Sequence, residues 1–175
     1  MSRFREWSGY FNSIINQFGQ DDVFIRFMIL WVSYNSYYNS LRETEPGLFI
    51  TQDEKTKDSE KAIIIYKKDK LRQFYESQHE RIVSEFKRIP SFNGNGLRDC
   101  VVDTRYNDIN STRNAKYPQN ENNLKYFLKA VYQIRCNLFH GDKTPYSETD
   151  KQLTEWAYKN LLIILNELNY DLFRE

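Results

Sequence analysis

Helical patterns dominate this sequence and predict an all-α fold of about four to five helices joined by long loops. Apolar residues recur at the i, i+3, i+4, i+7 spacing of amphipathic helices, and capping or stop residues bound most of these segments. The chain has 175 residues, of which 40% are hydrophobic and 16% aromatic, so it can bury one sizeable core. We therefore expect a single globular domain over residues 1–175.

Two helices are expected in the first part of the chain. The first covers residues 4–18, and the second begins after the capping aspartates at positions 21 and 22 and runs to about Arg42. Pro46 and the glycine that follows it end the second helix. Three tyrosines of the second helix are expected to belong to the core rather than to a platform for RNA bases: Tyr34, Tyr37 and Tyr38.

The middle of the chain alternates between helices and loops. A charged linker is expected over residues 45–57, followed by a helix over residues 59–78 and a further helical turn over residues 79–88. A short extended piece is expected at residues 100–103. Residues 105–123 are rich in Asn, Asp, Ser and Thr, which is the composition of a long loop, and such loops are often functional.

The clearest apolar stripes belong to the last two helices. One helix precedes Gly141, a residue typical of a helix end, and its stripe consists of Leu124, Phe127, Leu128, Val131, Ile134 and Leu138. The last helix is expected to open at Thr144 and Pro145. Its stripe consists of Leu153, Trp156, Ala157, Leu161, Ile164, Leu165 and Leu168.

Arg135 and His140 are the unusual residues of this region. Arg135 falls inside the apolar stripe, where a charge is costly unless it is paired, extends to water along its stem, or is covered by a partner. His140 lies at the helix terminus, where a cationic side chain interacts favourably with the last carbonyls. On an unbroken helix the two side chains would point about 140° apart, so a fraying last turn or a second copy must bring them together.

The segment around these residues resembles the signature of HEPN domains, an arginine and a histidine separated by four to six residues. The run YQIRCNLFHGDK, residues 132–143, is similar to Apea-like and related bacterial branches, where an R-x-N-x-x-H-G core follows an apolar helix. Residues 27–38 resemble the early helix of that branch, with a W-x-x-x-N pattern at Trp31 and Asn35 followed by tyrosines.

The resemblance implies a HEPN-like up-down bundle that forms a homodimer with the motifs of two subunits facing each other. Many family members are metal-independent endoribonucleases, which implies cleavage of single-stranded RNA by attack of the ribose 2′-hydroxyl on phosphorus. By the family's pattern His140 is the base and Arg135 clamps the phosphate. Asn137 is a supporting candidate, because Cys136 takes the place directly after the arginine where the family often has a polar residue.

The basic residues and the charge balance of the chain bear on how it would bind RNA. Four cations are candidates for contacts with RNA, with exposed loop positions as the alternative interpretation: Arg105, Arg113, Lys116 and Lys143. The 25 basic and 24 acidic residues nearly cancel, which argues against a general RNA-coating role but allows one cleft that holds a short single strand.

The sequence offers little for a metal or a membrane. Cys100 and Cys136 are too few and too far apart for a disulfide framework or a zinc site, and His79 has no ligand spacing. We therefore expect no metal and no cofactor. The N-terminal residues lack the apolar core of a secretion signal, and no apolar run approaches about 20 residues. These features favour a reduced, cytoplasmic setting without a membrane.

Two other functional interpretations stay open. The first is a non-catalytic HEPN-like module that binds nucleic acid, a nucleotide or a partner protein and keeps the motif as structural residues. The second is a partner of a nucleotidyltransferase antitoxin, but Asp142 stands where that group has a tyrosine, two residues after the histidine. The preferred interpretation is an endoribonuclease in a toxin or anti-phage setting, with an antitoxin or defence-system partner.

Overall fold

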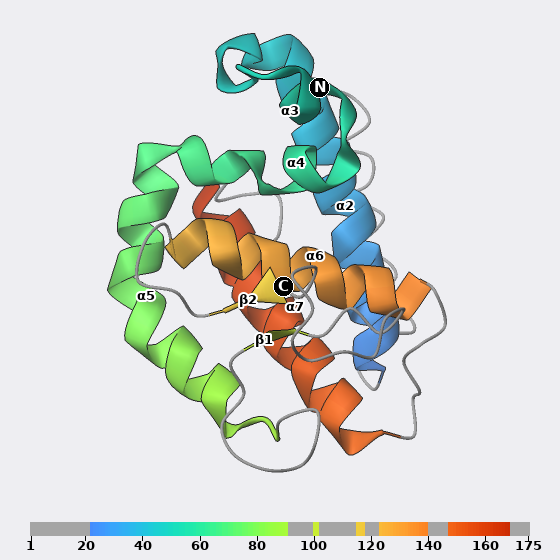
Figure 1. Cartoon of the computed structure of the whole chain (residues 1–175). Helices are drawn as coiled ribbons and strands as arrows, with labels where there is room; N and C mark the ends of the chain where they lie inside the picture. The colour runs from blue at the N-terminus through green and yellow to red at the C-terminus, as the bar shows by residue number, and fades with distance from the viewer. Residues whose placement is uncertain (1–21, 91–99, 102–114, 118–122, 140–146, 169–175) are drawn as a thin grey trace.

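The computed structural model describes residues 22–90, 100–101, 115–117, 123–139 and 147–168, and this part of the chain has an all-α fold (Figure 1). Its long helices are α2 (Val23–Thr44), α5 (Asp69–Arg88), α6 (Asn123–Phe139) and α7 (Glu148–Leu168). Its short elements are the helices α3 (Gln52–Thr56) and α4 (Asp58–Ile63), the 3₁₀ turns η1 (Pro46–Leu48) and η2 (Ile64–Lys67), and the strands β1 (Cys100–Val101) and β2 (Ala115–Lys116). The prediction of an all-α fold is confirmed.

Helix α7 packs along both α2 and α5, and α6 crosses α7 while also packing on α4 and α5 (Figure 1). The strands form a short antiparallel pair, with Cys100 opposite Lys116, and this pair packs against α6. Buried apolar side chains from all the long helices join one core cluster. The core therefore holds α6, which carries the arginine of the motif, from several sides.

Helix α2 begins where the sequence predicts. The Asp22 carboxylate accepts hydrogen bonds from the backbone N–H groups of Phe24 at 2.9 Å and Ile25 at 3.3 Å, as an N-cap does. The helix continues to Thr44, and Pro46 then starts the 3₁₀ turn η1. The predicted cap at Asp22 and the predicted stop at Pro46 are thus confirmed. The C-terminal end of α2 lies two residues beyond Arg42.

The segment between α2 and α5 differs from the prediction. The linker expected over residues 45–57 contains η1 and α3, and α3 opens with a capping box between Thr51 and Glu54. The helix expected over residues 59–78 is interrupted at Lys68, whose backbone is extended. The helical turn expected over residues 79–88 continues the preceding helix, because α5 runs from Asp69 to Arg88.

Three consecutive isoleucines lie where the helical path changes. Ile63, Ile64 and Ile65 are all buried in the core. Ile63 ends α4, and Ile64 and Ile65 belong to the 3₁₀ turn η2. The chain tightens into η2 at this point and starts again at Asp69, whose carboxylate lies in the favourable first turn of α5.

Helix α6 matches the stripe expected over residues 124–138, since Asn123–Phe139 is helical. Helix α7 begins at Glu148, after the expected opening at residues 144 and 145, which lie outside the described residues. Ser147 caps it, because its Oγ accepts a hydrogen bond from the Asp150 N–H at 3.2 Å. The expected piece at residues 100–103 is present in part, as strand β1.

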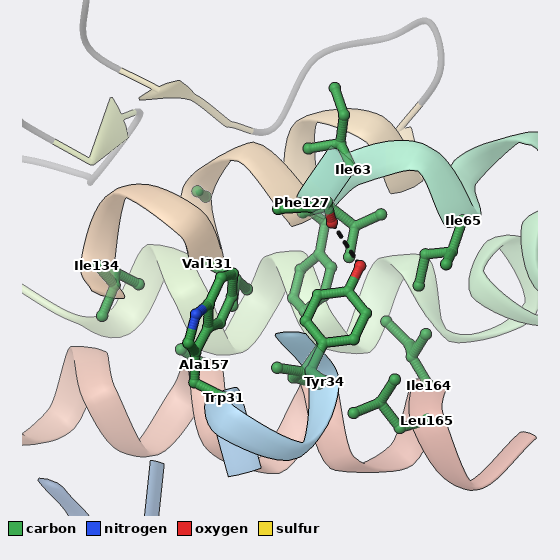
Figure 2. Packing of buried hydrophobic residues seen from close by; sticks show 14 of the residues in the cluster. Trp31, Tyr34, Ile63, Ile65, Phe127, Val131, Ile134, Ala157, Ile164 and Leu165 are labelled. Atoms are coloured by element: carbon green, nitrogen blue, oxygen red, sulfur yellow. Dashed lines mark hydrogen bonds between the residues drawn. The ribbon is translucent and has the colours of Figure 1, made fainter. Parts of the chain in front are cut away.

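The tyrosines of α2 lie in the core, as predicted. Tyr34 and Tyr38 are fully buried and stack edge-to-face with a ring separation of 5.2 Å. The Tyr34 hydroxyl donates a hydrogen bond to the Ala62 carbonyl on α4 (Figure 2). Burial raises the pKa of Tyr34 well above its usual value, and the neighbouring Tyr37 adds to this effect. This hydroxyl therefore stays protonated and ties α4 to α2.

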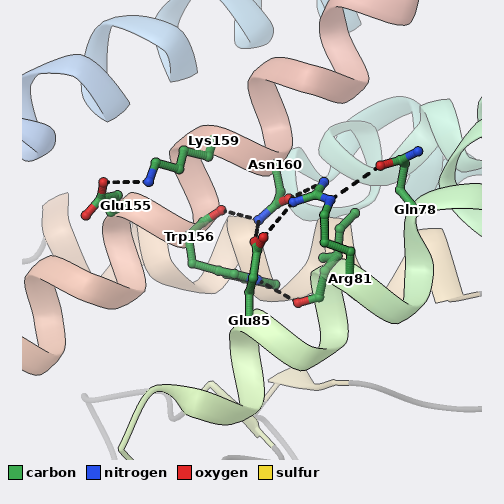
Figure 3. Close-up of polar contacts among 8 residues, drawn as sticks. Gln78, Arg81, Glu85, Glu155, Trp156, Lys159 and Asn160 are labelled. Atoms are coloured by element: carbon green, nitrogen blue, oxygen red, sulfur yellow. Dashed lines mark hydrogen bonds and ion pairs between the residues drawn. The ribbon is translucent and has the colours of Figure 1, made fainter.

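A polar network joins α5 to α7 (Figure 3). Asn160, fully buried on α7, accepts a hydrogen bond from Arg81 Nη2 at 3.1 Å and donates to the Trp156 carbonyl at 2.8 Å. The Trp156 indole in turn donates to the Ile82 carbonyl on α5 at 3.0 Å. Paired polar groups of this kind fix the register of two helices. Among the described helices, none has the length and apolar character that crossing a membrane requires.

Candidate functional site

The two segments that carry the family resemblance meet in this fold. Trp31 on α2 packs edge-to-face against Tyr132 on α6, with ring centroids 5.9 Å apart. Asn35, the second residue of the W-x-x-x-N pattern, lies one turn further along α2, where its side-chain oxygen accepts a hydrogen bond from Asn39 at 2.6 Å. The aromatic contact places the C-terminal part of α6, with Arg135, beside α2.

Aromatic rings surround the Arg135 guanidinium. Its Cζ atom lies 4.5 Å from the ring centroid of Phe139, 5.8 Å from that of Trp31 and 5.9 Å from that of Tyr132. All three separations are within the range of about 6 Å over which a ring face attracts a cation. We call Trp31, Tyr132 and Phe139 the aromatic cage of Arg135.

The polar contacts of this guanidinium are weak. Nη1 lies 3.8 Å from Cys136 Sγ, a poor acceptor, and Nε is buried without a hydrogen-bond partner. Within the described part of the chain, no acidic side chain forms an ion pair with Arg135. Arg135 is therefore a partly buried cation whose charge no acidic side chain among the described residues neutralises.

Arg135 falls inside the apolar stripe of α6, as the sequence predicts, but it is more exposed than its neighbours. Val131 and Ile134 on the same helix are fully buried, whereas Arg135 is only half-buried. The cost of burying a charge explains the difference, because partial exposure lets the guanidinium keep some water.

The Asp58 carboxylate binds the hydroxyl of Tyr132, one of the rings of the cage. Asp58, in the first turn of α4, accepts hydrogen bonds from the Tyr38 hydroxyl at 2.9 Å and from the Tyr132 hydroxyl at 3.5 Å. Burial and then the charge of Asp58 raise the pKa of Tyr38, and the positive charge of Arg135 opposes this only in part. Burial also raises the pKa of Tyr132. Both phenols therefore remain neutral donors.

Asn137 does not lie with Arg135. Its Oδ1 accepts a hydrogen bond from Gln133 Nε2 at 2.9 Å, and both side chains are buried. Two positions along a helix correspond to about 200°, so the side chains of residues 135 and 137 leave α6 in nearly opposite directions. On a continued helix the side chains of residues 137 and 140 would point about 60° apart. A role for Asn137 next to His140 stays a prediction.

Several predicted site residues lie outside the described residues: Arg105, Arg113, His140 and Lys143. Lys116 belongs to strand β2 through its backbone, and its side chain is also outside the description. Of the predicted pair of catalytic residues, the structure therefore describes Arg135. The last described residue before the histidine is Phe139, at the end of α6.

Sequence reasoning missed the aromatic cage. A signal for part of it was present, because Tyr132, Arg135 and Phe139 stand at i, i+3 and i+7 and so share one face of a helix. Trp31 gave no such signal, because it comes from a distant part of the chain. Only the packing of α2 on α6 brings it to Arg135.

Comparison of this chain with protein-family models, with curated proteins and with solved structures finds no match.

Proposed function

We propose that this chain is a metal-independent endoribonuclease that cleaves single-stranded RNA at a site built around Arg135 and His140. The observation that supports the proposal best is the state of the Arg135 guanidinium, which is half-buried, held by aromatic rings and without an acidic partner among the described residues. A charge in this state is stabilised when an anion joins it. RNA phosphate is such an anion, and its oxygens match the planar fork of arginine.

The proposed roles follow from the chemistry of RNA cleavage. His140 accepts the proton of the ribose 2′-hydroxyl while the hydroxyl oxygen attacks the adjacent phosphorus. Arg135 binds the non-bridging oxygens and stabilises the negative charge that gathers on them. The bond from phosphorus to the 5′-oxygen breaks, and this oxygen takes up the proton that His140 accepted, which leaves a 2′,3′-cyclic phosphate on one product and a 5′-hydroxyl on the other.

The remaining predicted residues have secondary roles in this proposal. Asn137 supports His140 from the same side of the helix terminus. The cations proposed to contact the RNA chain are Arg105, Arg113, Lys116 and Lys143. The HEPN resemblance extends the proposal to a HEPN-like bundle in a cytoplasmic toxin or anti-phage system with an antitoxin or defence-system partner.

The test is cleavage of a labelled single-stranded RNA in the presence of EDTA. Wild-type protein should cleave it and leave 2′,3′-cyclic phosphate ends. Arg135→Ala and His140→Ala should each slow cleavage by about 100-fold or more, the usual scale for a positioned base or charge stabiliser. Exposed Arg42 in the last turn of α2 offers a matched control, since Arg42→Ala removes a cation far from the cage.

Three results would contradict the proposal: products with 5′-phosphate ends, activity that EDTA abolishes and magnesium restores, or full activity of both variants. Melting temperatures of all variants, measured in parallel, separate loss of chemistry from loss of folded protein.

The cage also supports a second candidate, a non-catalytic module in which Arg135 is structural. The rings of Trp31 and Tyr132 belong to different helices, so the guanidinium that contacts both rings helps to join α2 and α6. Under this candidate Arg135→Ala lowers the melting temperature, and neither wild-type nor variant protein cleaves RNA. The same two measurements therefore distinguish the candidates.

A further inference from the structure

Phe139 exposes an aromatic ring directly beside the Arg135 guanidinium. It is 46% exposed, at the last residue of α6. The other large apolar residues with comparable exposure in the described part of the chain are aliphatic: Ile25, Met28 and Ile50.

The Arg135 guanidinium covers only part of this residue. The guanidinium carbon lies 4.5 Å from the ring centroid, closer than to either other ring of the cage. A separation of this size corresponds to a cation over the ring face. Phe139 is nevertheless 46% exposed, so a large part of it stays accessible to a ligand beside the cation.

We infer that Phe139 is the stacking residue for an unpaired base of the RNA, next to the phosphate held by Arg135. The inference rests on the proposed function and adds the way in which the substrate is recognised. A base is the part of RNA that gains from an exposed aromatic face, whereas the phosphate gains from the cation, and adjacent phosphate and base belong to one nucleotide.

Two consequences for the substrate follow. The base must be unstacked and unpaired to reach Phe139, so the cleaved segment is single-stranded. Stacking uses the face of a base, which all four bases share, so recognition at this position tolerates different sequences. The hydrogen-bonding edge of the base plays no part in this contact.

The experiment measures binding of a short single-stranded oligonucleotide that cannot be cleaved because its 2′-hydroxyls are absent. Phe139→Ala should weaken binding by about tenfold, within the range for loss of one base–aromatic stack. Phe139→Leu keeps apolar bulk without an aromatic face and should weaken binding similarly, while Phe139→Trp should retain it. Ile50→Ala, at a more exposed apolar position elsewhere, is the matched control and should leave affinity unchanged.

An abasic nucleotide scanned along the oligonucleotide identifies the partner of Phe139. At one position its removal should cost wild-type protein about tenfold in affinity and cost Phe139→Ala almost nothing more, because both changes delete the same stack. A purely structural role for Phe139 would make the two losses add at every position. Additive losses, unchanged affinity of Phe139→Leu, or no binding by the wild type would each overturn the inference.

The outcomes of the two proposals are separable. Cleavage by wild-type protein with additive losses would leave the endoribonuclease standing and remove the role of Phe139. Base-dependent binding through Phe139 without cleavage of natural RNA would support the stacking role of Phe139 and remove the endoribonuclease.

Discussion

A buried pair of tyrosine hydroxyls offers a quantitative test of how this core is held together. Tyr75 on α5 and Tyr117, next to β2, are both fully buried, and their hydroxyl oxygens lie 2.6 Å apart. Tyr75→Phe leaves the Tyr117 hydroxyl buried without its partner, and Tyr117→Phe does the same to Tyr75. An orphaned buried hydroxyl costs about 1–3 kcal/mol, so each single change should lower the free energy of unfolding by about 2 kcal/mol.

The double variant provides the decisive comparison. When both hydroxyls are absent, no polar group is orphaned, and the rings still pack against Phe127 and Trp156. The double variant should lose no more free energy of unfolding than either single variant, which gives a coupling energy of at least about 2 kcal/mol in magnitude. Urea denaturation followed by far-UV circular dichroism measures all four proteins. Additive losses would show that the two hydroxyls do not depend on each other.

The same pair predicts a response to alkali. Burial, then the neighbouring Tyr117, raises the pKa of Tyr75, and burial raises the pKa of Tyr117 despite the opposing hydrogen bond from Tyr75. A raised folded-state pKa gives stability that is fully present below the unfolded-state value of about 10 and is lost as the pH rises above it. The wild type should therefore lose more stability above about pH 10 than the double variant does.

Two further predictions concern acid and assembly. Burial opposes ionisation of Glu54, but hydrogen bonds from Lys67, Thr51 and Ile50 outweigh it and lower the pKa of Glu54. The stability from this carboxylate is present above about pH 4.3 and disappears as the pH falls through the lower folded-state value, so Glu54→Gln should be destabilising at neutral pH and nearly neutral in strong acid by urea denaturation. The active form should be a homodimer by light scattering at micromolar concentration, because the spacing of Arg135 and His140 alone does not bring them together; full cleavage by a diluted monomer would contradict this.

The parts of the fold that followed from sequence are those in which local signals agree with the packing. Asp22 caps α2 and Pro46 ends it, because both act through their own backbone geometry. The apolar stripe of α6 predicted the buried face of this helix, because the spacing of its side chains matches the helical period. The break at Lys68 was not predicted, because the residues around it include no proline or glycine that would end a helix, and the backbone becomes extended there only in the folded chain.

The candidate site shows the same division. Sequence identified Arg135 as a costly charge on an apolar helix, and the structure describes it as half-buried with a buried, unpaired Nε. Its partial exposure, and the ring of Trp31 beside it, depend on how α2 packs on α6. Helical spacing alone contains no information on that packing, although it did contain the alignment of Tyr132 and Phe139 with Arg135.

The energetics of the cage bear on why an arginine stands at this position. Contact of the guanidinium with rings contributes about 0.5–2 kcal/mol per favourable pair, while its buried and unpaired Nε costs about 1–3 kcal/mol. Three rings contact the guanidinium, so these contacts together equal or exceed the cost of the unpaired Nε, and the cage stabilises the contact between α2 and α6 even without a ligand. An incoming phosphate would add charge-assisted hydrogen bonds to the outer nitrogens of a cation that the rings already hold in place. The structural role and the proposed binding of an anion are therefore compatible, and the melting temperature and RNA cleavage of Arg135→Ala measure them separately.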